Sequence, residues 1–350
     1  MTPRRMKAAI LYGKEDVRIE SVEVPALGPG EVLLRTKASL TCGTDAKVYR
    51  RGYHARMIVP PSVFGHEVSG VVEEVGPGVE GLAPGVPVVV ANSAPCGSCE
   101  FCRRGRESLC DDLLFWNGAS AELARIPARI VAKNLLGLPP GLDFRAAALT
   151  EPLACVLRGV DECRVSAGQS VAVIGVGPIG QMLVAVCARR GASVTAVGRN
   201  PERLEAARET GAASVVAAGA EGDLGRQLLE LSPDGRGFEV VIEAAGQAGT
   251  SEAALMAARK GGVVNLFAGC PAGTLLGVEA HRLHYEEVRI ASTFHHTPAS
   301  FRESLRLIAD GHVDPMRFVT ASAPLERLPE ILVEMGRGGG LKTAIVPAEA

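Results

Sequence analysis

The stretch SVAVIGVGPIGQMLVAVCARRG, residues 170–191, decides the fold of one half of this chain. It opens with the continuous apolar run SVAVIGV, which is typical of a strand buried on both faces of a sheet. It continues with PIGQMLVAVCARRG, which has the apolar content of a packed helix and ends at Gly191. A buried strand followed directly by a helix indicates the start of a βαβ unit.

The same alternation continues toward the C-terminus. The strand SVTAVG precedes the helix PERLEAARETG, and GFEVVIEAAG, TSEAALMAARKGG and VVNLFAG repeat the order strand, helix, strand. Strands that alternate with helices predict a parallel sheet covered by helices. We therefore predict an α/β fold with a Rossmann-type, doubly wound parallel sheet.

The flanking regions have a different pattern. Residues 1 to about 90 predict an all-β segment, because the short runs KAAILY, VRIESVEV, EVLLRTKAS, GVVEEV and VPVVVA are separated by turn sequences. From about residue 295 the pattern is mixed, with helices in PASFRESLRLIADG and LERLPEILVEMGRG and strands in FVTASAP and LKTAIVPA. A chain of 350 residues is long enough for two domains.

The amino-acid composition argues against several classes of partner and location. The chain is 47% hydrophobic and 22% charged with a net charge of -2, so it has no electrostatic case for a nucleic-acid or membrane partner. Nine cysteines, several in apolar surroundings, favour reduced thiols. The N-terminus lacks the apolar core of a signal peptide. We expect a cytoplasmic protein.

A dinucleotide-binding fingerprint lies between the first strand and helix of the βαβ region. Gly175-Val-Gly177-Pro178-Ile179-Gly180 follows the strand VAVI and opens a helix, as this motif requires. The three glycines would allow a tight turn, close approach of a pyrophosphate and close helix packing, with the helix N-terminus facing the phosphates. The alternative, a glycine-rich turn without a ligand, is disfavoured by this context.

The end of the second strand bears on the choice between NAD and NADP. An acidic residue there would hold the ribose 2′-OH of NAD, but this chain has Gly198 followed by Arg199. Arg199 can pair with a 2′-phosphate, with Arg203 as a second contact. We expect NAD(P) as cofactor and lean toward NADP, although a solvated surface arginine explains Arg199 equally well.

Four cysteines lie close together in PCGSCEFCRRGRESLC. Cys96, Cys99, Cys102 and Cys110 have the spacing C-x2-C-x2-C-x7-C. Two intervening residues let a tight turn direct both thiolates at one point, and four thiolates complete a closed tetrahedral zinc shell. The sequence therefore predicts a structural zinc site, since a closed shell has no position for substrate.

Three further segments carry possible metal ligands. Cys42 lies in SLTCGTD, His66 and Glu67 lie in VFGHEVSG, and Glu151 lies in LTEPLACVLRG. Each residue alone is explained as a core or surface residue. Together with the cysteine lobe and GVGPIG, however, these segments resemble the zinc-dependent medium-chain alcohol and polyol dehydrogenases of the sorbitol and threonine dehydrogenase type. The resemblance runs over essentially the whole chain, with the motifs in the family's order.

The resemblance implies a domain organisation and a second zinc. It implies a GroES-like β-rich catalytic domain at 1–155 and 295–350, with the structural zinc lobe at 92–112, and a Rossmann NAD(P)-binding domain at 156–294. The implied catalytic zinc ligands are Cys42, His66 and Glu151, with Glu67 beside them. Which glutamate binds the resting zinc stays open, and either set leaves a position for substrate. The implied total is two Zn²⁺ per chain.

The resemblance also implies a mechanism. Zinc acts as a Lewis acid on the alcohol, and hydride passes to the nicotinamide. Thr44 matches the hydroxyl that takes the alcohol proton, and a strand-end hydroxyl bonded to backbone is the alternative. Lys47 stands where relatives commonly have a histidine and is protonated at pH 7, which leaves the terminal proton acceptor open. Asp45 either orients this relay or caps the following turn.

Other residues have two explanations. Trp116, the single tryptophan, is either a wall of a substrate cleft or a core residue. The pair His295 and His296 marks the expected return to the catalytic domain and offers too few ligands to predict a metal site of its own.

We expect a cytosolic zinc-dependent oxidoreductase that acts on a secondary alcohol of the polyol, cyclitol or hydroxy-amino-acid type and its ketone. The expected partners are this small molecule and further copies of the chain in a dimer or tetramer, without nucleic acid or membrane. One alternative is a zinc-ribbon nucleic-acid-binding protein with a nucleotide-sensing domain. Another is a zinc-free, quinone-reductase-like member of the same superfamily, which would need no metal ligands at positions 42, 66 and 151.

Overall fold

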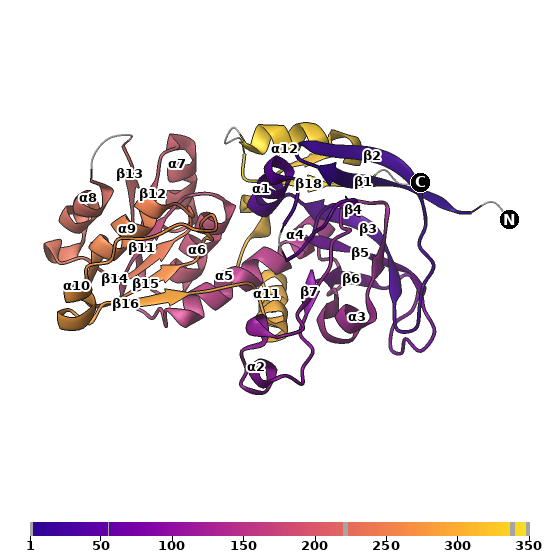
Figure 1. The fold of residues 1–350 in the computed structure, drawn as a ribbon, viewed down its shortest axis with the longest axis horizontal. Helices are drawn as coiled ribbons and strands as arrows, with labels where there is room; N and C mark the ends of the chain where they lie inside the picture. The colour runs from indigo at the N-terminus through magenta and orange to yellow at the C-terminus, as the bar shows by residue number, and fades with distance from the viewer. Residues whose placement is uncertain (1–2, 55, 220–222, 337–339, 348–350) are drawn as a thin grey trace. The chain divides into compact units, whose positions relative to one another are not determined.

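The computed structural model describes residues 3–54, 56–219, 223–336 and 340–347. Contacts within the chain divide it into two compact units (Figure 1). The first unit combines residues 1–154 with 296–350, and the second comprises residues 155–295. The C-terminal segment therefore folds with the N-terminal half, and the second unit is inserted between them.

The second unit is built on a parallel sheet. Its six described strands have the order β13-β12-β11-β14-β15-β16, and each neighbouring pair is parallel. Numbered from the first strand of the unit this order is 3-2-1-4-5-6, the Rossmann order, so the predicted fold class is confirmed. The strands are β11 (Ser170–Ile174), β12 (Ser193–Gly198), β13 (Ser214–Ala217), β14 (Phe238–Glu243), β15 (Ala258–Leu266) and β16 (Arg289–Ser292).

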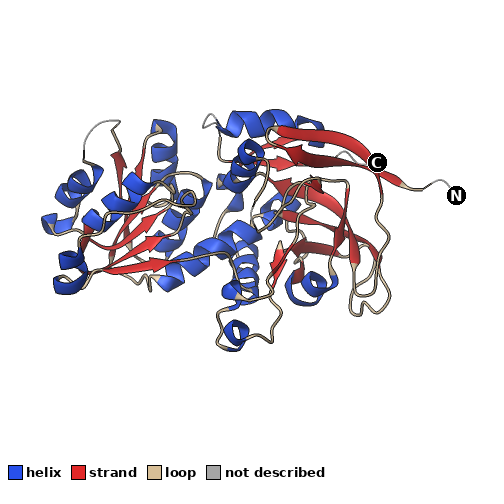
Figure 2. Ribbon diagram, in the orientation of Figure 1, coloured by secondary structure: helices blue, strands red, loops and turns tan. Residues whose placement is uncertain are grey.

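Helices cover this sheet (Figure 2). Helix α6 packs against α7, and α8 packs against α9. All five residues of β11 are buried, which explains why the four residues after Ser170 are all apolar. The helices are α5 (Thr150–Glu162), which runs across the boundary between the units, and α6 (Pro178–Arg189), α7 (Pro201–Thr210), α8 (Leu224–Leu231), α9 (Ala248–Ala257) and α10 (Ala280–Tyr285).

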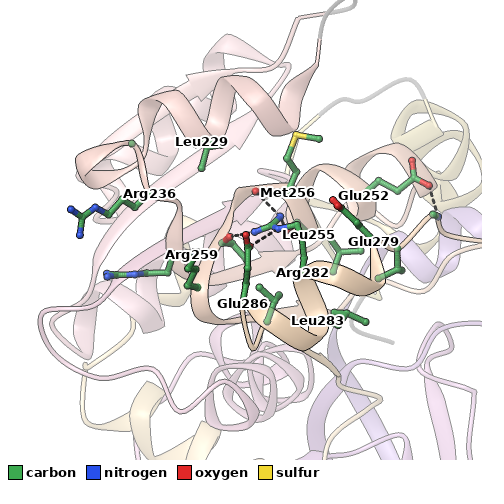
Figure 3. A pocket seen from close by; sticks show the side chains of 16 residues that line it. Leu229, Arg236, Glu252, Leu255, Met256, Arg259, Glu279, Arg282, Leu283 and Glu286 are labelled. Atoms are coloured by element: carbon green, nitrogen blue, oxygen red, sulfur yellow. Dashed lines mark hydrogen bonds and ion pairs between the residues drawn. The ribbon is translucent and has the colours of Figure 1, made fainter.

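The sequence-based prediction for TSEAALMAARKGG was wrong at its end. Helix α9 stops at Ala257, and β15 begins at the next residue. Figure 3 shows the reason, because Arg282 reaches from α10 to the end of α9. Its guanidinium donates to the carbonyl oxygens of Leu255, at 2.6 Å, and of Ala258, also at 2.6 Å. A tertiary contact therefore satisfies carbonyls that a longer helix would have bonded internally.

The first unit is β-rich. Its described strands form a three-stranded sheet, β2-β1-β4, a seven-stranded sheet with the path β10-β6-β5-β3-β18-β17, in which β9 also pairs with β3, and a two-stranded sheet, β7-β8. The last strand, β18, thus lies directly beside β3 from the N-terminal region. The strands are β1 (Arg5–Gly13), β2 (Asp16–Glu23), β3 (Val32–Leu40), β4 (Ser62–Val63), β5 (Val68–Val75), β6 (Pro87–Val90), β7 (Ser93–Ala94), β8 (Leu114–Phe115), β9 (Leu123–Ile126), β10 (Leu135–Gly137), β17 (Val319–Ala323) and β18 (Lys342–Ile345).

The prediction of an all-β N-terminal region was also wrong at one place, because helix α1 (Gly43–Arg51) interrupts it. Cys42 is the N-cap, and the Asp45 carboxylate accepts the backbone N–H of Cys42 at 2.8 Å. Gly52 ends the helix in the left-handed conformation, with φ of 85°. The other helices of this unit are α2 (Glu100–Arg103), α3 (Ala128–Asn134), α4 (Phe144–Ala148), α11 (Pro298–Ala309) and α12 (Leu328–Gly336).

Candidate metal centres and cofactor-binding turn

The four-cysteine lobe has the geometry of a metal site. The sulfur atoms of Cys96, Cys99, Cys102 and Cys110 all lie within 4.8 Å of one another. The Cys96 and Cys102 sulfurs are 3.9 Å apart. Zinc–sulfur bonds of about 2.3 Å in a tetrahedron require sulfur atoms roughly 3.8 Å apart, so these residues fit a closed zinc shell.

Neighbouring groups and burial shift the pKa values of two lobe cysteines in opposite directions. The backbone N–H and hydroxyl of Ser98, with the N–H of Cys99, lower the pKa of Cys96 to about 6. Burial raises the pKa of Cys102 to about 12. A bound cation is therefore required to hold all four residues as thiolates at neutral pH.

A second group of donor atoms forms where α1 begins. The sulfur of Cys42, a ring nitrogen of His66 and a carboxylate oxygen of Glu67 lie within 4.8 Å of one another. Cys42 precedes α1, whereas His66 and Glu67 directly precede β5, and β3 pairs with β5 in the same sheet. Pairing of these two strands thus brings together residues that are more than twenty positions apart in the sequence.

Asp45 fixes the orientation of this group. One carboxylate oxygen lies 3.0 Å from Nδ1 of His66, and the other accepts the N–H of Cys42. With Nδ1 held by Asp45, Nε2 is the nitrogen available to a metal. Asp45 therefore caps the turn, as one of its two predicted roles required, and also positions the imidazole.

Asp45 and Cys42 both act on the protonation of His66. Burial by itself would lower the pKa of His66, but the Asp45 carboxylate and the Cys42 thiol together outweigh this effect and raise that pKa well above its ordinary value. A metal that binds at Nε2 must displace the proton. With a metal at Nε2, Asp45 would accept the remaining N–H of a neutral imidazole.

Glu67 forms a buried ion pair with Lys342, a residue that the sequence analysis did not identify. Both of its carboxylate oxygens lie against Nζ of Lys342, at 2.7 and 2.6 Å. The side chains are 0% and 1% exposed. Burial would lower the pKa of Lys342, but Glu67, with smaller contributions from Cys42 and Glu151, more than offsets it and raises that pKa. Lys342 is one lysine in the predicted strand LKTAIVPA, and no local sequence signal marks it as buried.

Glu151 does not belong to the group of Cys42, His66 and Glu67. It lies in the first turn of α5, is 5% exposed, and its Oε1 is 3.8 Å from Nε2 of His296. That nitrogen also lies 3.0 Å from the side-chain oxygen of Asn92. The sequence analysis named His296 without a role, and the structure places it beside Glu151.

The proposed proton-relay residues lie on α1. Thr44 is half-buried in the first turn of α1 and Lys47 is exposed one turn later. The alternative of a strand-end hydroxyl at Thr44 is wrong, because the residue is helical.

Trp116 is a core residue, 8% exposed, whose ring N–H donates to the carbonyl oxygen of Arg125 at 2.9 Å.

The three glycines of the GxGxxG turn differ in their surroundings. Gly175 has φ of 108°, which side chains rarely adopt. A Cβ on Gly180 would lie 1.7 Å from the carbonyl oxygen of Gly175, so helix and strand approach too closely for any side chain. A Cβ on Gly177 would meet nothing within 4 Å, which leaves open space over the turn. Pro178 and Ile179 start α6, whose N-terminal N–H groups are available to a phosphate.

The end of β12 lacks room for an acidic side chain. A Cβ on Gly198 would lie 2.2 Å from a methyl carbon of Val176. The next residue, Arg199, is exposed, and Arg203 is half-buried in α7. A side chain at position 198 therefore cannot contact the adenosine ribose, and Arg199 and Arg203 are the nearest basic residues that follow it in the sequence.

A cavity of about 960 Å³ also lies in the second unit, away from the glycine turn (Figure 3). It is lined by α9 and α10 and by the start of β15, at Ala258. The glycine turn follows β11 at the carboxyl end of the sheet. Because the strands are parallel, the cavity lies at the opposite edge from the dinucleotide fingerprint.

Two protein families match this chain. Residues 28–139 match the alcohol dehydrogenase GroES-like domain, and residues 178–310 match the zinc-binding dehydrogenase family. The chain therefore belongs to the zinc-dependent medium-chain alcohol and polyol dehydrogenases. It is an enzyme, an NAD(P)-dependent oxidoreductase of that family.

Characterised relatives support this assignment. The chain is 29% identical to a sorbitol dehydrogenase from Bacillus subtilis over 94% of this chain and 93% of the relative. It is 38% identical to an L-threonine 3-dehydrogenase from Pyrococcus abyssi over 75% of this chain and 74% of the relative. It is 30% identical to a 2-dehydro-3-deoxy-L-galactonate 5-dehydrogenase from Pseudoalteromonas atlantica, over 97% and 98% respectively.

Solved structures have the same fold. A zinc-binding dehydrogenase from Sinorhizobium meliloti bound to NADP matches with a TM-score of 0.89 and 31% identity, over 98% of this chain and all of that one. An alcohol dehydrogenase from Thermus sp. ATN1 matches with a TM-score of 0.88 and 32% identity over the same shares. Within the described residues, no helix has the length and apolar character needed to span a bilayer.

The contacts of Asp45 lead to a first prediction. Asp45→Asn keeps the shape but removes the negative charge that orients His66, so zinc affinity at Cys42 and His66 should fall roughly 10- to 100-fold. Competition with a chromogenic chelator measures this. The lobe zinc serves as an internal control and should be retained, and unchanged affinity at both sites would contradict the role of Asp45.

Proposed function

We propose that Cys42 and His66 hold a catalytic zinc, with Glu151 or Glu67 as the remaining protein ligand, and that the cysteine lobe holds a structural zinc. The observation that carries this proposal is the anchoring of both Cys42 and His66 by one carboxylate, that of Asp45. A thiolate and an imidazole, with a carboxylate hydrogen-bonded to the imidazole, are typical of a zinc centre that keeps an open position.

The proposed reaction is oxidation of a secondary alcohol to a ketone and its reverse. The zinc supplies Lewis acidity toward the substrate oxygen when it is bound. Thr44, two residues beyond Cys42, accepts the alcohol proton and passes it outward along α1. Lys47 is exposed one turn away, so a proton that leaves Thr44 along this face of α1 reaches solvent.

The proposed substrate is a polyol, a cyclitol or a hydroxy-amino acid. The relatives at 29–38% identity are named for sorbitol, threonine and a sugar acid, all of which carry a secondary alcohol beside further polar groups. A zinc-ribbon nucleic-acid protein gains no support from these relatives, which are dehydrogenases over most of their length. A zinc-free reductase would have no use for the grouping of Cys42 with His66.

The proposed cofactor site is the turn Gly175–Gly180, with NADP favoured over NAD. Gly198 has no room for the carboxylate that would read a 2′-hydroxyl, and Arg199 follows it with an exposed guanidinium. One related structure contains NADP. Gly177 and the first residues of α6, Pro178 and Ile179, would face the pyrophosphate.

We also propose a homo-oligomer, dimer or tetramer, in the cytoplasm. Among the described strands, β16 ends the six-stranded sheet and pairs on one side only, and Ile290 in it is 41% exposed. An unpaired strand edge is a template for pairing with another copy. The nine cysteines all lie within the described ranges and none of them forms a disulfide, which fits a reducing compartment.

The zinc assignment predicts about two zincs per chain, one closed and one open site. Cys42→Ser should reduce this to about one and abolish oxidation of polyols, cyclitols and threonine, followed by nicotinamide absorbance. Cys270→Ser, away from both metal groups, is the matched control and should keep both metals. One zinc in the parent, or full activity in Cys42→Ser, would refute the catalytic assignment.

The cofactor assignment predicts that Arg199→Ala weakens NADP more than NAD. Loss of a charge-assisted contact to the 2′-phosphate should cost about 1.5–3 kcal/mol, a factor of roughly 10 to 150 in the dissociation constant of NADP. Fluorescence titration of each reduced cofactor measures this, with Arg208→Ala on the helix that follows Arg199, α7, as control. Equal losses for both cofactors would show that Arg199 does not contact the phosphate.

The oligomer proposal predicts that sedimentation velocity gives two or four times the chain mass. Ile290→Lys places a charge on the open edge of β16 and should shift the population toward monomer. Val333→Lys, on an exposed helical position of similar exposure, should not. A monomeric parent protein would contradict the proposal.

A further inference from the structure

Lys342 is one of the largest fully buried side chains of the protein, and it is a cation. Its Nζ contacts the two carboxylate oxygens of Glu67 at 2.7 and 2.6 Å and the carbonyl oxygen of Thr41 at 3.0 Å. An ammonium group has three N–H donors, and these three contacts use all of them. The ion pair is therefore a fully satisfied buried unit.

This unit touches both segments that carry the proposed catalytic ligands. Thr41 immediately precedes Cys42, and Glu67 immediately follows His66. Strand β18 is further joined to Thr41 by two hydrogen bonds, from Thr41 N–H to the Thr343 carbonyl and from Thr343 N–H to the Thr41 hydroxyl, each 3.0 Å long. Lys342 thus enters the site from the C-terminal strand as part of a fixed arrangement.

Glu67 is close enough to reach a metal held by its neighbours. One of its oxygens lies within 4.8 Å of the donor atoms of both Cys42 and His66. Yet both oxygens are directed at Nζ of Lys342. We infer that Lys342 is a positioning residue that holds Glu67 away from the metal at Cys42 and His66, so that a coordination position stays available to substrate.

The inference rests on the proposed function, because it assumes a metal at Cys42 and His66. Without the ammonium, Glu67 would be a buried carboxylate with no cationic partner, which proteins avoid strongly. The nearest available cation would then be the metal itself. Coordination by Glu67 would place a further negative charge on the zinc, weaken its Lewis acidity and fill the position that the substrate needs.

A purely structural role for Lys342 predicts something different. In that case the loss of the ion pair would loosen the packing of β18 against β3 and β5. The metal site would then become less ordered and would release zinc faster. The direction of the change in zinc release therefore separates the two roles.

The test compares Lys342→Met, Glu67→Gln and the double variant Lys342→Met/Glu67→Gln with the parent enzyme. We expect Lys342→Met to release its catalytic zinc to a chelator roughly tenfold more slowly. Residues that contact the ligands of a metal typically change the affinity for that metal by about this factor or more. Its kcat should fall. The double variant, which has no carboxylate at position 67, should return to the parent release rate and regain kcat.

Cobalt substitution gives a readout independent of turnover. The visible spectrum of cobalt at Cys42 and His66 should be unchanged in Glu67→Gln, because Glu67 is not a ligand in the parent. It should change in Lys342→Met and return in the double variant. The lobe cobalt contributes the same spectrum throughout. Lys342→Gln, which keeps a hydrogen-bond donor, replaces Lys342→Met if the latter does not fold.

Lys7→Met serves as the control, since its side chain is 53% exposed and lies on β1. Faster zinc release in Lys342→Met, or a changed cobalt spectrum in Glu67→Gln, would overturn the inference while leaving the catalytic zinc in place. A parent protein with one metal per chain would instead refute the proposed function, and the two failures are thereby distinguished.

Discussion

The catalytic unit depends on a buried ion pair between its last strand and its second metal-ligand segment. Lys342 and Glu67 are 275 positions apart and are both sealed from solvent. Removing one partner of such a pair costs about 3–5 kcal/mol, because the other charge stays buried. The C-terminal strand is therefore required beside β3, and the segments of Cys42 and His66 are held on either side of one ammonium.

Asp45 and Lys342 act on neighbouring ligands in opposite ways. Asp45 is an anion that contacts Nδ1 of His66, so that Nε2 would face a metal in the proposed site. Lys342 is a cation that binds both carboxylate oxygens of Glu67 and, in our inference, keeps them from that metal. Together, these two buried charges determine which donor atoms are available to a metal. A dehydrogenase needs such a balance, since zinc must be held firmly and still leave a position for the alcohol oxygen.

Much of the architecture could be predicted because it is encoded locally. The alternation of apolar strands and helices after residue 165 predicted the Rossmann sheet, and GVGPIG predicted a turn in which Gly180 has no room for a side chain. Two elements were predicted incorrectly. Helix α1 depends on capping of Cys42 by Asp45, and the end of α9 depends on Arg282 from another helix. The periodicity of apolar residues along a strand or helix does not encode either of these contacts.

The spacing of the cysteines predicted a zinc site and the glycine turn between strand and helix predicted a dinucleotide, whereas the class of chemistry followed from the resemblance of all the motifs together to one family. The sequence named Cys42, His66, Glu67 and Glu151 but could not rank the two glutamates. Only the tertiary structure revealed that Glu67 is paired with Lys342 and that Glu151 lies beside His296. The reason is physical: the pairing of buried charges is decided by which strands become neighbours, and β18 joins β3 across the length of the chain.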